Sequence, residues 1–469
     1  MSRRGFFVKT HIPGLDEVIP GFPRGGLVLV SGPPGSGKTI LGMSYIYYGA
    51  VNAQEPGLYA SMFESKERFL KLANGLGMDF ENLMKKGLVD YLQLPMALET
   101  GATSAVDMIV DQVENLGAKR LVIDSITAIK EVFKDPSEAR SLLQNIISRI
   151  LEQLKCTTII IKEGETTGRD FEEYVADAVI GLERTLFENR RLRILKIQKL
   201  RGAEVRTPRL CFTIHKGVRV LPPTELMMPR ELLSPEQVKQ ALPPDPPKGY
   251  TTGIPDLDRE IGGLQDGSIT LLELSPKLTA RTAYNLILAS LVVNYVEKGR
   301  PCLIVPPGGV SSKDLNEMLW RYRVSEEERR HLVRIVEIEK LKPPAAKDRT
   351  FLIEQFTNLL KSLEKEAGKP PLKLIGMDRA ADFMGEEVIP VIYRAVDELR
   401  ERGGLAVWIV TPTYQWIVNR LAPLADVHLK ITRMHGCVLL YGVKPRTPLY
   451  AIQPDPTSKT PIPNLIPIV

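Results

Sequence analysis

Cysteine is scarce in this chain of 469 residues, and the few cysteines are scattered along it. None forms a C-x-x-C pair or lies beside a histidine cluster, which excludes the usual zinc-binding spacings. The scarcity also excludes a small disulfide-stapled fold and favours reduced thiols in a cytoplasmic protein. The four cysteines are Cys156, Cys211, Cys302 and Cys437.

Long apolar runs are also missing. The most apolar helical stretch, residues 286–296, is too short to span a bilayer and contains Asn294. The first residues lack the apolar core and cleavage site of a signal peptide. We therefore expect a soluble protein with no membrane insertion.

A strong excess of one charge is absent too. Sixty-two Lys and Arg residues face 56 Asp and Glu residues, giving a mild formal net charge of +6. This balance permits nucleic-acid contact but favours an ordinary surface of mixed sign. The apolar and charged fractions, 43% and 25%, are typical of globular proteins. A chain of this length exceeds one ordinary core, so two domains are expected.

The stretch from Gly32 to Thr39 has the sequence GPPGSGKT and satisfies the phosphate-loop pattern G-x-x-x-x-G-K-[ST]. An apolar run before it predicts a buried strand, and the periodicity after it predicts a helix. Glycines let successive N–H groups converge on phosphate oxygens, which argues against a chance glycine-rich turn. The expected contacts to a nucleoside triphosphate are Gly32, Pro33, Pro34, Gly35, Ser36, Gly37, Lys38, Thr39 and Ile40.

Short apolar runs at 58–62, 121–124 and 157–161 alternate with helical stretches and predict a mostly parallel sheet. Ligands bind beyond the carboxyl ends of such strands, where Glu64, Asp124 and Glu163 lie. We expect Asp124 and Thr39 to hold Mg²⁺, the alternative for Asp124 being a helix N-cap. Glu64 is expected to polarise the attacking water, the alternative being a solvated loop residue.

The opening segment of the chain recurs in its second half. Ile12-Pro-Gly-Leu-Asp16 matches Ile254-Pro-Asp-Leu-Asp258, and the glycines that follow match at the same offset. This predicts an internal duplication, with a proline-rich stretch between the copies. The expected divisions are a first domain at 1–221, a linker at 222–248, a second domain at 249–450 and a proline-rich tail at 451–469. Whether the tail packs on its own domain or docks on a partner stays open.

These motifs resemble those of the RecA-superfamily ATPases, and within them the KaiC-like branch. The resemblance rests on the segments 12–16, 32–39, 121–125, 175–180 and 199–202, in the family's order. It implies two tandem RecA-like α/β domains, ATP and Mg²⁺ as ligands, and a ring or filament, for example a hexamer. It further implies that Lys199 and Arg201 reach the γ-phosphate of the adjoining subunit. The residues alone favour a surface strand with solvated cations.

Two departures from the family pattern change these expectations. The family usually has two adjacent glutamates where this chain has Phe63-Glu64, so slow hydrolysis by Glu64 alone is expected. In the second copy the phosphate loop has degenerated, so neither ATP binding nor autokinase activity is expected there. Asp378 is expected to cap a helix or pair with a cation, and Lys444-Pro-Arg446 weakly echoes the pair at 199 and 201. The degenerate positions are Leu274, Lys277, Thr279, Ala280 and Arg281.

The favoured function is that of a cytoplasmic ATP-hydrolysing regulator or scaffold. Its nucleotide state would control oligomerisation and the binding of a protein partner that the sequence does not identify. A recombination accessory protein of the RecA or RadA type that binds single-stranded DNA is the alternative. It is less favoured because the loop 163–170 is net acidic. A third alternative is an ATP sensor that barely hydrolyses its ligand.

Overall fold

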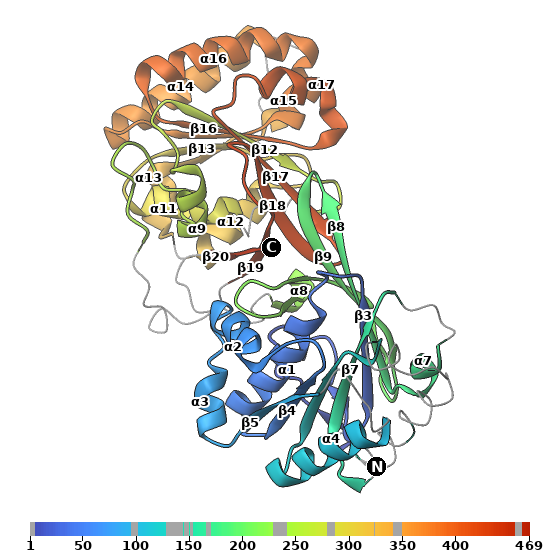
Figure 1. Cartoon of the computed structure of the whole chain (residues 1–469). Coiled ribbons are helices and arrows are strands. Elements are labelled where there is room, and N and C mark those ends of the chain that lie inside the picture. The colour runs from blue at the N-terminus through green and yellow to red at the C-terminus, as the bar shows by residue number, and fades with distance from the viewer. Residues whose placement is uncertain are drawn as a thin grey trace. The chain divides into compact units, whose positions relative to one another are not determined.

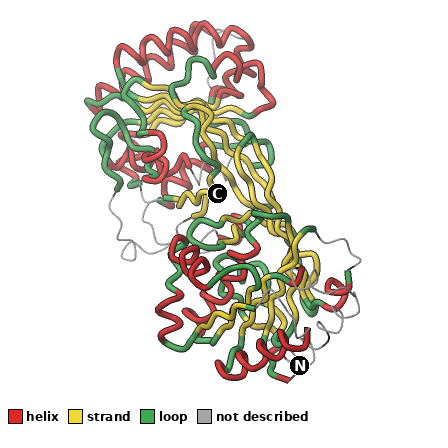
Figure 2. Tube along the Cα trace, viewed as in Figure 1, coloured by secondary structure: helices red, strands yellow, loops and turns green. Residues whose placement is uncertain are grey.

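The computed structural model describes residues 5–94, 102–127, 144, 150, 153–165, 170–227, 242–278, 287–322, 324–340, 349–454 and 462–469. The chain forms two compact units (Figure 1). Unit 1 comprises Met1–Leu226, His435–Cys437 and Pro467–Val469, and unit 2 comprises Met227–Met434 and Val438–Ile466. In each unit helices cover a central sheet, as the tube in Figure 2 shows.

Unit 1 is built on a nine-stranded sheet of order β11-β10-β9-β8-β3-β7-β6-β4-β5. Strands β8, β3, β7, β6, β4 and β5 are parallel to one another, while β9, β10 and β11 continue the sheet beyond β8 with antiparallel pairing. The elements are β1 (Phe7–Val8), β2 (Phe22–Pro23), β3 (Leu27–Gly32), α1 (Lys38–Ala53), β4 (Gly57–Ser61), α2 (Lys66–Gly75), α3 (Phe80–Lys85), β5 (Val89–Gln93), α4 (Ala102–Leu116), β6 (Arg120–Asp124), β7 (Thr157–Glu163), α7 (Phe171–Val175), β8 (Ala178–Phe187), β9 (Arg190–Leu200), β10 (Arg209–Thr213), β11 (Arg219–Leu221) and α8 (Thr224–Met227).

Every residue of β3 is buried, because both faces of the sheet are covered. Successive side chains of a strand point to opposite faces. Val28 and Val30 accordingly join the core on the α1 side, whereas Leu27 and Leu29 join the core on the α4 side. A continuous apolar run is therefore the expected sequence for this central strand.

Unit 2 repeats the architecture, with the sheet order β14-β13-β15-β16-β12-β17-β18-β19-β20. The prediction of two tandem RecA-like α/β domains is confirmed. Its elements are α9 (Pro255–Ile261), β12 (Ser268–Leu274), α11 (Ala289–Glu297), β13 (Cys302–Val305), α12 (Ser312–Arg321), α13 (Glu326–Leu332), β14 (Val333–Ile335), η5 (Ile338–Lys340), α14 (Arg349–Ala367), β15 (Leu372–Gly376), α15 (Met377–Met384), η6 (Gly385–Glu387), α16 (Val388–Arg402), β16 (Leu405–Val410), η7 (Pro412–Tyr414), α17 (Gln415–Leu421), β17 (Val427–Met434), β18 (Cys437–Lys444), β19 (Tyr450–Pro454) and β20 (Pro463–Pro467).

The aspartates of the duplicated motif make the same contact in both units. Asp16 accepts the backbone N–H of Thr10 at 2.9 Å, and Asp258 accepts that of Thr252 at 2.8 Å. A second aspartate in each unit fixes the start of the central strand. The N–H of Leu27 donates to Asp177, and that of Ile269 donates to Asp426, both at 2.9 Å. The two units thus share the hydrogen bonds that fix the duplicated motif and the start of the central strand.

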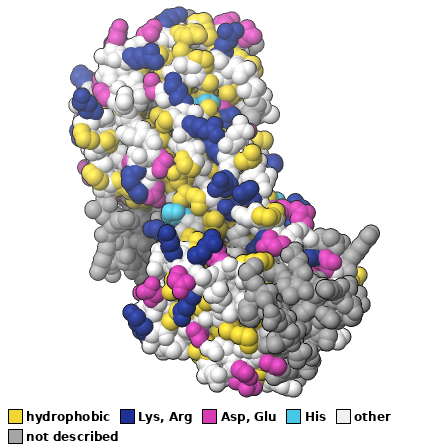
Figure 3. All heavy atoms as spheres, in the orientation of Figure 1, with side chains coloured by type: hydrophobic (Ala, Val, Ile, Leu, Met, Phe, Trp, Pro, Cys, Tyr) yellow, Lys and Arg dark blue, Asp and Glu magenta, His cyan; other side chains and the backbone are white. Residues whose placement is uncertain are grey.

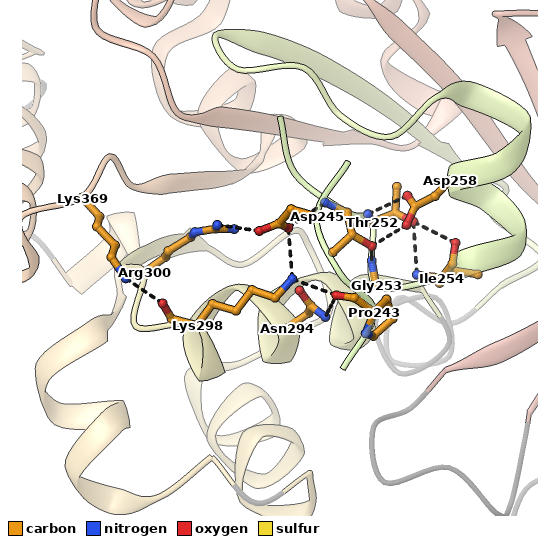
Figure 4. A network of polar contacts seen from close by, with 11 residues as sticks. Pro243, Asp245, Thr252, Gly253, Ile254, Asp258, Asn294, Lys298, Arg300 and Lys369 are labelled. Atoms are coloured by element: carbon orange, nitrogen blue, oxygen red, sulfur yellow. Dashed lines mark hydrogen bonds and ion pairs between the residues drawn. The ribbon is translucent and has the colours of Figure 1, made fainter. Parts of the chain in front are cut away.

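Part of the segment expected to be a linker belongs to unit 2. Asp245 forms ion pairs with Lys298 at 3.0 Å and Arg300 at 2.6 Å (Figure 4). It also accepts the backbone N–H of Thr251. The guanidinium of Arg300 also lies over the ring of Tyr250. Residues 228–241 of the expected linker lie outside the described residues.

The segment expected to be a tail contributes two strands to a sheet. Residues 450–454 form β19 and residues 463–467 form β20, so proline did not prevent edge pairing there. No helix among the described residues is long and apolar enough to cross a membrane. On the face of unit 2 that Figure 3 shows, Lys and Arg side chains are interspersed with acidic and apolar ones.

Candidate nucleotide-binding site

The loop between β3 and α1 adopts backbone conformations that depend on its glycines. Gly35 and Gly37 have φ values of 73° and 108°, in the left-handed region that side chains disfavour. A Cβ on Gly32 would lie 2.4 Å from the carbonyl oxygen of Leu182. No side chain caps the N-terminus of α1, so the N–H groups of its first turn are left for another acceptor.

Two arginines from the β8–β9 pair lie against this loop. The buried Arg193 donates to the carbonyl oxygens of Gly35 and Ser36, at 3.0 Å each, and to that of Val469. Burial, together with the nearby Arg191 and Arg184, lowers the pKa of Arg193 to about 10. Arg184 lies opposite Arg193 in the strand pairing. The sequence prediction missed Arg193, because its strand indicated only a row of solvated cations.

Lys38 is held inside the loop by three acceptors. Its Nζ donates to the carbonyl oxygens of Gly32 and Pro33 and forms an ion pair with Glu163 at 2.8 Å. The Lys38 side chain is buried, whereas that of Glu163 is 44% exposed. The register of the sheet causes this contact, since Gly32 and Glu163 are paired at the carboxyl ends of β3 and β7.

Asp124 ends β6 beside the loop and is joined to Thr39. Thr39 Oγ1 and the hydroxyl of Tyr59 each donate to Asp124 Oδ2 at 2.8 Å. Burial raises the pKa of Asp124, and the hydrogen bonds from Tyr59 and Thr39 counteract part of this rise. Tyr59 in turn stacks on Tyr91, with ring centroids 6.1 Å apart. An aspartate at a helix N-cap accepts a backbone N–H of the helix that follows it. The two donors to Asp124 Oδ2 are instead side-chain hydroxyls.

The residues present fit a triphosphate with a divalent cation. Ser36 lies in the phosphate loop, and its Oγ is buried without a hydrogen-bond partner within the described part of the chain. A phosphate bound in the loop could supply that partner. The loop offers an ammonium group and uncapped N–H groups, which suit phosphate oxygens. A hydroxyl and a carboxylate in contact suit Mg²⁺, which prefers oxygen ligands.

Glu64 follows β4 on the same edge of the sheet as Asp124. Strands β4 and β6 are parallel neighbours, with Ser61 paired to Asp124. The Glu64 side chain is partly exposed, and its backbone is fixed by Ser61 Oγ and by the hydroxyl of Tyr91. Phe63, which occupies the place of the family's other glutamate, is 59% exposed.

Lys199 and Arg201 lie near the amino ends of the parallel strands, whereas the phosphate loop follows the carboxyl end of β3. Lys199 is paired with Val179, near the start of β8, and β8 runs parallel to β3. Lys199 donates to the carbonyl oxygens of Glu173 and Tyr174, while Arg201 forms an ion pair with Asp177 at 3.1 Å. Burial and the charge of Arg201 lower the pKa of Lys199. The structure therefore does not bring this pair to the loop of its own chain.

The corresponding loop of unit 2 lacks these features as far as it is described. Leu274 ends β12, and Leu278 is buried four residues later. Thr279, Ala280 and Arg281 lie outside the described residues. Asp378 lies in the first turn of α15, where it accepts the N–H groups of Gly308 and Arg379. Lys444 donates to the carbonyl oxygen of Ala425 at 2.7 Å, much as Lys199 contacts carbonyl oxygens in unit 1.

Known proteins resemble this chain over part of its length. The family model described as the KaiC ATPase matches residues 8–225. A UPF0273 protein of Sulfurisphaera tokodaii is 30% identical over 217 residues, which cover 42% of this chain and 76% of that protein. The chain belongs to the KaiC-like ATPases of the RecA superfamily.

Proteins named KaiC or KaiC-like match over different lengths. The circadian clock oscillator protein KaiC 1 of Synechocystis is 31% identical over 229 residues, 46% of this chain and 44% of that protein. The circadian clock oscillator protein KaiC of Parathermosynechococcus lividus is 26% identical over 347 residues, 70% of this chain and 60% of that protein. The chain thus spans less than two thirds of the length of these two KaiC proteins. The crystal structure of a KaiC-like protein from Pyrococcus horikoshii OT3 has 31% identity and a TM-score of 0.42, covering 46% of this chain and 99% of that chain.

Proposed function

We propose that unit 1 binds and slowly hydrolyses ATP with Mg²⁺, and that its nucleotide state controls self-assembly and the binding of a protein partner. The contact of Thr39 with Asp124, beside Lys38 in a glycine-built phosphate loop, carries this proposal. Loop N–H groups and Lys38 would hold the phosphates, and Thr39 and Asp124 would hold Mg²⁺. The loop contacts would come from residues 32–40.

Hydrolysis would depend on Glu64 as the base. A carboxylate near the carboxyl ends of β4 and β6 can take a proton from water while the γ-phosphate is attacked. With Phe63 in place of a second glutamate, turnover would be slow. Lys38 would first have to exchange Glu163 for phosphate oxygens, so the ion pair of 2.8 Å would give way on binding.

Lys199 and Arg201 would act on the ATP of a neighbouring subunit. Their position near the amino ends of the parallel strands, away from the phosphate loop of their own chain, supports a role in trans. There the two cations would stabilise the charge that develops on the transferred phosphoryl group. Each complete site would then combine the loop of one subunit with the cations of the next.

A mixing experiment tests this arrangement. Glu64→Gln and Arg201→Ala are each expected to lower ATP turnover at least tenfold when assayed alone. Mixed in equal amounts, they should regain roughly a quarter of the wild-type rate, because about a quarter of the interfaces then combine two intact halves. Absence of recovery in an assembled mixture would show that the site does not need a second subunit.

Mass photometry with ATP and Mg²⁺, in parallel with phosphate release, tests the regulatory part. We expect nucleotide-dependent assembly and hydrolysis that single-stranded DNA does not change. DNA-stimulated hydrolysis, with binding that weakens steeply as salt rises, would instead support the recombination alternative. Nucleotide binding without measurable turnover in wild type and Glu64→Gln alike would support an ATP sensor.

Unit 2 would serve as a structural or regulatory platform without ATP. A non-hydrolysable ATP analogue should bind the full chain once per subunit, and Lys38→Met should remove that binding. A second equivalent that survives Lys38→Met would place nucleotide on unit 2 and overturn this part of the proposal.

A further inference from the structure

Unit 2 contains an apolar cavity that is unrelated to the phosphate loop. It has a volume of about 360 Å³ and lies between β13, β15 and β16 and the helices α14, α15 and α16. In Figure 1 these three helices lie together along one side of the unit 2 sheet. Sites for small organic ligands typically occupy roughly 300–1,000 Å³ and are lined mainly by apolar side chains. The cavity falls within that range.

The helices leave the cavity accessible. Ile353, Phe356 and Leu360 of α14 line it but are only partly buried, whereas Leu363 on the same helix is fully buried. On α16, Ala395 lines the cavity and is exposed. An apolar ligand can therefore gain contacts there, because the described residues leave part of the apolar lining exposed.

Lys373 of β15 projects toward this apolar space. Along β15, Leu372 and Leu374 join the core on one face, while Lys373 and Ile375 line the cavity on the other. Lys373 is flanked in the sheet by Leu303 of β13 and Ala406 of β16, which also line the cavity. An ammonium group among aliphatic neighbours is costly unless an anion pairs with it.

Within the described part of the chain, no hydrogen bond or close ion pair engages Lys373. Burial lowers its pKa, although the charges of Glu398 and Glu364 act in the opposite sense. Glu398 is itself paired with Arg402 at 3.4 Å. A narrower polar pocket adjoins the apolar cavity, and it includes Lys361, Lys373 and Arg402 together with Glu364 and Glu398. Three cations thus face two carboxylates there, and one of these carboxylates, that of Glu398, is already paired with Arg402. The cavity therefore combines an apolar interior with a polar end of net positive charge.

We propose that this cavity binds an aliphatic monocarboxylate, with the alkyl chain between α14, α16 and the sheet and the carboxylate on Lys373. The carboxylate supplies the charge-assisted hydrogen bonds that Lys373 lacks. The chain length is limited by the cavity, and each methylene buried before the cavity is full adds about fourfold in affinity. This site is independent of the proposed ATPase function.

Calorimetric titration of the full-length chain with hexanoate, octanoate and decanoate, below their micelle concentrations, tests the proposal. We expect saturable binding of one decanoate per chain, with affinity that rises along the series. Decanol, which has the same number of carbons but no charge, should bind at least tenfold more weakly. Absence of saturable binding by any of the three acids, or equal affinity for decanoate and decanol, would overturn the proposal.

Two variants locate the site. Lys373→Met should remove the preference for decanoate over decanol, and Ala380→Phe, which fills the cavity, should weaken both ligands at least tenfold. The matched control Lys365→Met, on the exposed side of α14, should change neither. Circular dichroism checks folding, and the fluorescence of Trp408, which lines the cavity, provides a second readout. Retained preference in a folded Lys373→Met protein contradicts the assignment.

Discussion

At the scale of single residues, the surroundings of Asp124, the candidate metal ligand, shift its pKa in opposite directions. Asp124 is partly buried, and this burial favours its protonated form, whereas two hydroxyl donors favour its ionised form. The balance between them decides the pH at which the carboxylate becomes available to a cation. Because Tyr59 is itself buried and stacked, its hydroxyl is held in place.

Tyr59→Phe should therefore shift the pH dependence of ATP hydrolysis. Loss of the hydroxyl removes a bond that lowers the pKa of Asp124, so the carboxylate ionises only at higher pH. Activity on the acid limb should fall about five- to tenfold, with less than about a twofold change at the optimum. Tyr91→Phe is the control for the pH profile: that hydroxyl donates to the Glu64 carbonyl oxygen, so its loss can lower the rate at every pH without moving the acid limb. Superimposable profiles for wild type and Tyr59→Phe would exclude this role.

Arg193 offers a second prediction at this scale. Arg193→Met removes two hydrogen bonds to the phosphate-loop carbonyls and should weaken ATP-analogue binding about tenfold, because the loop loses its preformed shape. A fluorescence titration measures this change. Arg191→Met, two positions earlier and exposed, is the matched control. If both variants bind equally well, Arg193 does not organise the loop.

At the scale of elements, Arg120 fastens β6 to its surroundings. Its buried guanidinium forms an ion pair with Glu55 and donates to the carbonyl oxygens of Lys9, Thr10 and Tyr45. It also lies 4.5 Å from the centre of the Tyr45 ring. One side chain thus joins the start of β6 to α1 and to the N-terminal segment.

Arg120→Met should lower the free energy of unfolding of unit 1 by about 3–5 kcal/mol, because it leaves a carboxylate and three carbonyl groups without their partner. Urea denaturation followed by circular dichroism measures the loss. Arg68→Met, on the exposed side of α2, should cost less than about 0.5 kcal/mol. A loss below about 1 kcal/mol for Arg120→Met would mean that water replaces these contacts readily.

The sequence predicted what is encoded over short stretches. The phosphate loop and its flanking strand and helix are contiguous, and the apolar runs indicated the parallel strands. Contacts between distant residues were not predicted: Arg193 reaches Gly35 across 158 positions, and Lys38 reaches Glu163 across 125. Only the pairing of β3, β7, β8 and β9 brings these residues together. The position of Lys373 among apolar neighbours likewise depends on strand register.

At the scale of the whole molecule, the two copies share their sheet architecture and the hydrogen bonds of the duplicated motif, but they differ in the phosphate loop. The aspartates at 16 and 258 hold equivalent backbone N–H groups, while the glycines of the first phosphate loop have no counterparts in the second. The shared architecture therefore does not depend on the residues proposed to bind nucleotide. In unit 2, Asp245 adds contacts from the segment before the duplicated motif.

Asp245 is expected to make the stability of unit 2 depend on pH in the acid range. Partial burial disfavours its charge, but bonds from Arg300, Thr251 and Lys298 outweigh burial and lower the pKa of Asp245 to about 2. The resulting stability is present above the unfolded pKa of about 4 and is lost as pH falls toward 2.

Asp245→Asn should cost roughly 1 kcal/mol at neutral pH, after allowance for solvent screening, and should flatten the loss of stability of unit 2 between about pH 4 and 2. Urea denaturation at a series of pH values measures this. The exposed Asp397→Asn, on α16, is the matched control. If the free energy of unfolding of Asp245→Asn falls between about pH 4 and 2 as steeply as that of wild type, other groups cause the loss of stability in acid.

The distance of Lys199 and Arg201 from their own phosphate loop has a consequence for counting. If every site needs a loop from one chain and cations from the next, an isolated chain has no complete site. An open row has one site fewer than it has chains, and only a closed ring completes them all. Turnover per chain would then rise with protein concentration and level off at closure, so dilution alone would switch the enzyme off.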